Sequence, residues 1–189
     1  MVFGGDSAST DDMFGQTSAA QDKVWKIGDF LMGGAGSWRG LQLARYAFIP
    51  PKRGRAAIEP FMVTTFIDAL RDVWKKGGHL FKSDKDDSDP KEETVSTDLM
   101  IGYRGELWVV RGNLQILKMR EDYAAIGSGT DAALGALYAT RNGGATNARV
   151  LTALRAAERY NAAVRGPFRI IDNKPETPAP TMKNKKEAK

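Results

Sequence analysis

The 189-residue chain contains no cysteine, a single histidine and no long apolar run. The absence of cysteine excludes a disulfide framework, a cysteine zinc site and a cysteine nucleophile, and it fits a reducing compartment. The one histidine, His79, leaves little scope for a histidine metal site and offers one candidate for a Ser-His-Asp triad. Because His79 directly follows a predicted helix, a surface cap at that helix's C-terminus is the favoured interpretation. No stretch approaches the ~18 apolar residues that a membrane span requires, and no secretory signal begins the chain.

The chain also lacks a concentrated basic surface, although its net charge is +5. Residues 173–189 hold five lysines and two acids, so this segment carries +3 and the rest of the chain carries +2. The body has no basic stripe interleaved with aromatic residues, and nucleic-acid binding is therefore not expected. Three prolines (Pro175, Pro178 and Pro180) and the lysines of this segment predict a disordered, solubilising tail.

Residues 82–93 hold six acids and three lysines, which predicts an exposed loop insertion. Three side chains in it have the spacing of calcium ligands in an EF-hand loop: Asp84, Asp86 and Ser88. However, Asp89 occupies the position of the turn glycine, and Val95 occupies that of the bidentate glutamate. We therefore reject calcium binding, and we expect neither a metal nor a cofactor.

Apolar periodicity predicts an alternation of strands and helices. Strands are expected at 2–5, 23–27, 30–34, 96–103, 106–111, 113–117, 123–126 and 168–171, and helices at 37–48, 58–74, 131–140 and from Thr146 or Asn147 onward. Gly28-Asp29 and Arg104-Gly105 predict hairpin turns. The order of strands, two helices, strands, two helices and a strand predicts an α+β fold, a four-layer αββα sandwich spanning residues 1–172. One sheet should be covered by Phe61, Phe66, Leu70 and Trp74, and the other by Leu134, Leu151 and Leu154.

Residues 125–129, Ala-Ile-Gly-Ser-Gly, form the most informative stretch of the chain. Here a predicted strand ends in a glycine turn that opens directly into an alanine-rich helix. This arrangement presents Ser128 and backbone N–H groups at the helix mouth, where they can hold a polar group or a developing negative charge.

Five stretches in a defined order give the chain a resemblance to the proteasome β-subunit family, most closely to its HslV-type members. They are the strand-plus-aspartate segment 2–10, the Lys-Val pair 23–24, the Gly-Ala-Gly-Ser turn 34–37, the hairpin 99–108 and the Ala-Ile-Gly-Ser-Gly turn 125–129. The resemblance runs from residue 2 to residue 171 and therefore covers nearly the whole predicted domain.

The resemblance implies an N-terminal nucleophile hydrolase of the threonine peptidase type. In that family the first residue of the mature chain attacks a peptide carbonyl, and its own α-amine, which titrates near ~8, is the base. By resemblance, Lys23 keeps the pKa of that amine low, Asp6 is the carboxylate partner of Lys23, and Ser128 orients the amine. The Gly36 N–H would form the oxyanion hole. The resemblance also implies a homo-oligomeric ring, peptide substrates, an unfoldase or other assembly partner and a cytoplasmic location, without nucleic acid or membrane.

The sequence departs from the family pattern at the nucleophile. The family's nucleophile begins one strand upstream, whereas Met1 and Val2 align inside the next strand. We therefore expect a peptidase subunit whose nucleophile-bearing strand is missing from this chain. The alternative is a non-catalytic subunit with a structural or assembly role in a ring, for example in a larger cellular or viral assembly, and a third interpretation is an unrelated αββα binding module. A second departure lies at 160–165, where relatives often supply a carboxylate and the nearest one here is Glu158.

Overall fold

The computed structural model describes residues 1–10, 15–82 and 92–173, and the structural statements that follow refer to these residues. The predicted charged loop at 82–93 and the predicted tail at 173–189 lie almost entirely outside them. Among the described residues, no helix has both the length and the apolar character needed to cross a bilayer.

The structure is α+β and is built around a five-stranded antiparallel sheet with the order β10-β9-β8-β5-β4. Its strands are β4 (Val24–Ile27), β5 (Phe30–Gly36), β8 (Thr97–Tyr103), β9 (Glu106–Val110) and β10 (Ile116–Lys118). A second sheet pairs only β1 (Val2–Gly5) with β11 (Arg169–Asp172), also antiparallel. Two short pairs complete the strands: β2 (Ala8–Thr10) with β3 (Gln16–Ser18), and β6 (Phe81–Lys82) with β7 (Glu93–Thr94). The two predicted hairpins are confirmed as β4-β5 and β8-β9.

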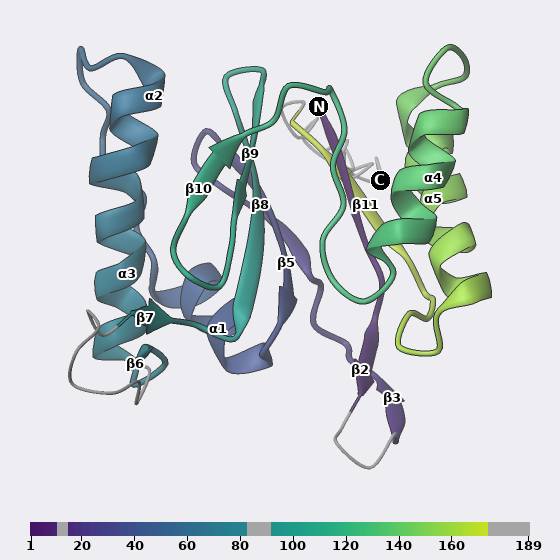
Figure 1. Cartoon of the computed structure of the whole chain (residues 1–189), viewed down its shortest axis with the longest axis horizontal. Coiled ribbons are helices and arrows are strands. Elements are labelled where there is room, and N and C mark those ends of the chain that lie inside the picture. Colours follow the sequence, from purple (N-terminus) through teal and green to yellow (C-terminus); the bar gives the residue numbers. More distant parts are fainter. Residues whose placement is uncertain (11–14, 83–91, 174–189) are drawn as a thin grey trace, which may run out of the picture.

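One pair of helical segments covers the outer face of the five-stranded sheet (Figure 1). The first runs through α1 (Trp38–Gln42) and the π-helical turn η1 (Leu43–Ala47), and it stops shortly before Pro50-Pro51. The second is continuous through α2 (Ile58–Phe61), η2 (Met62–Phe66) and α3 (Ile67–Lys76). The predicted apolar stripe of this second helix is confirmed, because its four large side chains, Phe61, Phe66, Leu70 and Trp74, are buried to 2 % exposure or less.

Strand alternation divides the side chains of the five-stranded sheet between two apolar clusters. On β4, Trp25 joins the helical side, whereas its neighbour Val24 faces the β1-β11 sheet. On β9, Trp108 and Leu107 divide in the same way. The cluster between the two sheets is small and includes Phe3 of β1. The five-stranded sheet is therefore buried on both faces.

A second helix pair, α4 (Thr130–Ala139) and α5 (Thr146–Tyr160), covers the outer face of β1 and β11 (Figure 1). The predicted core residues here, Leu134, Leu151 and Leu154, are only half-buried, and the buried side chains are those of Leu137, Ala153 and Ala157. Leu154 does pack on β1 as predicted, since its Cδ1 would lie 2.8 Å from a Cβ on Gly4. All three leucines are less buried than the first helix pair, because the sheet beneath has two strands and leaves part of their apolar faces uncovered.

The predicted strand at 123–126 is also not formed. These residues run alongside the purple β1 strand in Figure 1, between β10 and α4, but they belong to no sheet. A strand is defined by hydrogen bonds to a neighbour, and none of the strands in the described residues hydrogen-bonds to this segment.

Candidate active site

Lys23 and Asp6 form a half-buried ion pair where two strands meet. Asp6 follows the last residue of β1, and Lys23 precedes the first residue of β4. The Lys23 Nζ lies 2.8 Å from Asp6 Oδ1, with the two side chains 16 % and 13 % exposed. The other oxygen, Oδ2, accepts the N–H groups of Ala8 at 2.8 Å and Arg165 at 3.3 Å. Asp6 is thus fixed by the backbone on its far side and holds the ammonium group of Lys23 in one place.

Gly36 ends β5 beside this pair. Its φ of 99° is a left-handed conformation that favours glycine, and an added Cβ would collide with the Ser96 carbonyl. On the β8 side of β5, the Ser37 N–H donates to the Ser96 carbonyl. On the β4 side of β5, the Gly34 N–H donates to the Lys23 carbonyl at 2.9 Å. Because N–H directions alternate along a strand, the Gly36 N–H points to the Lys23 edge. Within the described residues, no acceptor bonds to it.

Ser128 lies in the turn that opens α4. Gly127, with φ 92°, brings this turn against β5, since a Cβ on Gly127 would lie 2.9 Å from the Ala35 Cβ. The turn therefore lies next to Gly36 in space, although the two are distant in sequence. The Ser128 carbonyl accepts the Asn161 side-chain N–H at 2.6 Å. Its hydroxyl makes no hydrogen bond to any part of the chain that the structure describes.

The four predicted site residues line one cavity of about 700 Å³. Its walls are β1 and the segment 118–129, and the remaining surface comes from the five-stranded sheet and the inner faces of α4 and α5. Lys23, Asp6, Gly36 and Ser128 are therefore accessible from the same space. Its volume falls within the range of ligand pockets.

Three residues make contacts at this site that were not anticipated from the sequence. The Trp38 ring lies 5.7 Å from Lys23 Nζ, and its indole N–H donates to Ser9 Oγ at 2.9 Å. Asn161 contacts the Ser128 turn, and the Arg165 backbone contacts both Asp6 and Ser7. The segment after α5 thus ties the two sides of the site together.

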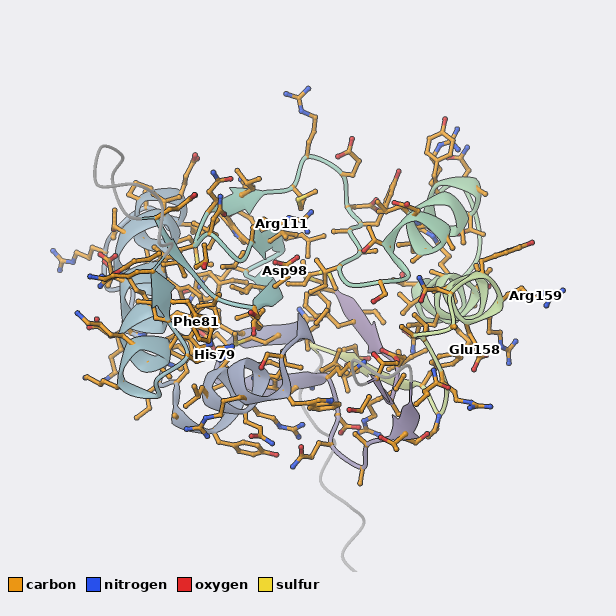
Figure 2. All side chains as sticks on the ribbon, turned by 60° about the horizontal axis from the view of Figure 1, so that its bottom comes forward. His79, Phe81, Asp98, Arg111, Glu158 and Arg159 are labelled. Carbon is orange, nitrogen blue, oxygen red and sulfur yellow. The ribbon has the colours of Figure 1, made fainter. Side chains whose placement is uncertain are left out.

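Glu158, the carboxylate nearest in sequence to the family position, does not reach the Ser128 turn. Its Oε1 accepts the Gly166 N–H at 2.8 Å, and its side chain lies on the outer α5 side in Figure 2. Within the segment 160–165, it is the side chain of Asn161 that contacts the Ser128 turn.

His79 is buried, which corrects the prediction of a surface cap. The backbone N–H of His79 does donate to the Trp74 carbonyl at 2.8 Å, near the end of α3, as a cap would. However, the ring turns inward beside Phe81 and places Nε2 3.3 Å from Thr97 Oγ1 (Figure 2). Burial, with a smaller contribution from the Arg39 charge, lowers the pKa of His79. The ring contacts no carboxylate among the described residues and does not line the cavity, so it forms no triad there.

No protein-family model and no curated protein matches the sequence. Among solved structures, the chain is similar to BPH from Thiobacillus denitrificans, with a TM-score of 0.72, 19 % identity, and 93 % of this chain and 94 % of that chain covered. The same protein in complex with epoxomicin gives a TM-score of 0.69 at 19 % identity, with 92 % and 93 % covered. Eukaryotic HslV from Trypanosoma brucei gives 0.62 at 19 % identity, with 90 % and 91 % covered. The chain therefore has an HslV-type fold, as the sequence resemblance predicted.

Proposed function

We propose that this chain is an HslV-like peptidase subunit that carries the activating half of a threonine-type active site. The nucleophile would be the first residue of a strand that is not among these 189 residues. The observation that carries the proposal is the 2.8 Å Lys23–Asp6 pair, at a cavity that also presents the unpaired Gly36 N–H. An ion pair alone is common in protein structures. A fixed ammonium group, a free backbone donor and a helix mouth around one cavity are the parts that acyl transfer requires.

The chemistry follows from what each group would do to an incoming N-terminal threonine. The threonine α-amine takes the hydroxyl proton as Oγ bonds to the substrate carbonyl carbon. The nearby Lys23 charge favours the neutral amine and the developing alkoxide. The Gly36 N–H donates to the oxyanion, and Ser128 orients the amine. The peptide C–N bond then breaks, the leaving amine takes the proton, and water releases the acyl group.

The wider assembly is part of the same proposal. With the additional strand, the fold would be the four-layer αββα sandwich of N-terminal nucleophile hydrolases, with residues 1–172 as its domain. We propose a cytoplasmic homo-oligomeric ring that encloses its sites and works with an unfoldase. The exposed Tyr46 and Ile49 (66 % and 85 %) support contacts between subunits, and the modest charge of the body opposes them little.

The test is to place a Thr-led strand upstream of Met1 and measure hydrolysis of fluorogenic peptides. We expect turnover with the strand present, and a loss of about 10²- to 10³-fold in kcat/KM on Lys23→Ala. Lys26→Ala is the matched control. It removes another lysine, which is exposed on β4 and does not line the cavity, so turnover should be unchanged. Epoxomicin binding, which the similar BPH shows, should also require the strand.

A folded, ring-forming protein that remains inactive with the Thr-led strand would refute the peptidase proposal. That outcome would favour the non-catalytic ring subunit. A monomer in sedimentation velocity at micromolar concentration would refute the ring and leave an isolated binding module.

A further inference from the structure

We infer that copies of this chain meet head to tail, with the acidic segment 84–92 of one copy on the basic segment 52–55 of the next. The inference rests on the proposed function only for the existence of a ring, and it is independent of the peptidase chemistry. It identifies the two surfaces that join neighbouring copies. Both surfaces follow from the distribution of charge about one helix.

The basic segment lies in the connection between η1 and α2. From residue 30 to residue 58 the sequence contains five basic side chains and no acidic one, and three of the five lie close together: Lys52, Arg53 and Arg55. Lys52 and Arg55 are exposed, and Arg53 is half-buried and donates to the Ala56 carbonyl. None of the three forms an ion pair with a described residue. Positive charge is therefore concentrated here without compensation from this part of the chain.

Exposed apolar side chains precede the basic segment. Ile49 is 85 % exposed, and Tyr46 in η1 is 66 % exposed, with the Arg45 guanidinium 5.3 Å from its ring. Protein–protein contacts are enriched in aromatic residues and arginine and place apolar side chains beside charged ones. Residues 45–55 thus have the composition of a docking surface, and their cations require a partner that carries acidic groups.

The acidic segment lies beyond the other end of the helix that α2, η2 and α3 form. Residues 84–92 contain five acids and two lysines, between the strands β6 and β7. These strands pair Lys82 with Glu93, and Arg71 Nη2 of α3 donates to Glu93 Oε1 at 2.7 Å. In Figure 1, β6 and β7 lie near the C-terminal end of α3, whereas α2 lies at the opposite end of the helix. This chain therefore supplies its own acidic partner for the basic segment.

The length of the helix separates the two segments within one molecule. Residues 58–76 form a continuous helix of about 28 Å, at 1.5 Å per residue. Because Lys82 and Glu93 are paired, the residues between them must leave and return, and they extend at most about 18 Å from β6 and β7. This reach is shorter than the helix. Contact between the two segments is therefore favoured between copies over contact within one copy.

Opposite charges at the two ends of one helix make each copy complementary to the next. A head-to-tail contact of this kind is heterologous, and it closes into a ring when the rotation between neighbours allows it. Two basic segments, or two acidic ones, repel each other, so the same charges disfavour a head-to-head contact. The charges therefore determine the direction of assembly as well as its surfaces.

The experiment reverses each surface in the 189-residue protein and follows association by sedimentation velocity at micromolar concentration. One variant carries Lys52→Glu and Arg55→Glu, and the other carries Asp86→Lys and Asp87→Lys. Each should sediment as a monomer, whereas the unaltered protein should associate and should dissociate as NaCl rises from about 0.05 M to about 0.5 M. The control carries Arg155→Glu and Arg159→Glu on the exposed side of α5, and its association should be unchanged.

A mixture of the two reversed variants tests contact between copies directly. The intact acidic segment of the first variant matches the intact basic segment of the second, and the two reversed segments also match each other. We therefore expect association to return in an equimolar mixture, and in one chain that carries all four substitutions. Two reversed variants that stay monomeric when mixed, although each is folded by circular dichroism, would overturn the inference.

The outcomes separate this inference from the proposed function. A ring that neither reversal weakens refutes the contact and leaves the proposed function intact. Association that returns on mixing, without peptidase turnover by the protein with the Thr-led strand, supports the contact and refutes the chemistry. An unaltered protein that is monomeric at low salt refutes both the contact and the proposed ring.

Discussion

The two halves of the molecule are built from similar parts but differ in how far their helices are buried. In the half that contains α2, η2 and α3, the helices lie on five strands, and Phe66, Leu70 and Trp74 are 0 % exposed. In the half that contains α4 and α5, the helices lie on two strands and a cavity, and Leu151 and Leu154 remain half-buried. The difference teaches that the five-stranded sheet covers its helices more fully than the two-stranded sheet covers α4 and α5.

Matched leucine substitutions measure this difference directly. The largest effect is expected in the half built on the five-stranded sheet. Leu70→Ala removes a fully buried side chain and leaves a cavity, so the free energy of unfolding should fall by about 2–5 kcal/mol. Urea denaturation followed by circular dichroism provides the measurement. A loss below about 1 kcal/mol would show that this half is packed no better than the other.

Asp6 joins the two halves, and its removal should have the next largest effect. Asp6→Ala leaves the Ala8 and Arg165 N–H groups and the Lys23 ammonium group without their acceptor. We expect a loss of about 1–3 kcal/mol in urea denaturation. Asp72→Ala removes an exposed carboxylate 3.8 Å from Arg71 and serves as the control, with an expected change within about 0.5 kcal/mol.

Leu154→Ala, in the half that contains α4 and α5, should have a milder effect. The free energy of unfolding should fall by about 1 kcal/mol, because the side chain is already half-exposed. Thermal melts of the variant and of the unaltered protein test this. A loss as large as that of Leu70→Ala would mean that Leu154 is packed as fully as the helices on the five-stranded sheet.

The smallest expected effect on stability concerns His79, in the half built on the five-stranded sheet. Because its pKa is lowered in the folded state, the unfolded chain binds its proton more readily. Stability should therefore be unaffected above pH 6.5, the ordinary pKa, and should decline as the pH falls below it. His79→Gln should flatten this decline between pH 7.5 and 5.5 in urea titrations. An unchanged slope in the variant would assign the decline to other groups.

Local chemistry was sufficient to predict much of the fold. The Gly28-Asp29 and Arg104-Gly105 turns and the apolar stripe of residues 58–74 are properties of adjacent residues. They appear in the structure as predicted. The Lys23–Asp6 pair was available only through the family resemblance, since nothing local links two residues 17 positions apart.

The failed predictions share a different cause. Residues 123–126 have strand-like composition, but strand formation depends on a hydrogen-bonded neighbour, and none of the strands in the described part of the chain pairs with them. Leu134 and Leu151 are less buried than expected for the same reason, because burial requires a covering layer. His79 turned inward because Gly40, distant in sequence, leaves space beside its ring. Each of these properties belongs to long-range packing and not to the residue itself.

The position of Trp38 gives this site an optical reporter. Of the four tryptophans, Trp25, Trp74 and Trp108 are at most 5 % exposed, whereas Trp38 is partly exposed and lies 5.7 Å from Lys23 Nζ. A collisional quencher such as acrylamide would therefore dim mainly the fluorescence of Trp38. Occupation of the space around Lys23 would shield that indole, so the emission of the unlabelled protein would follow binding in real time.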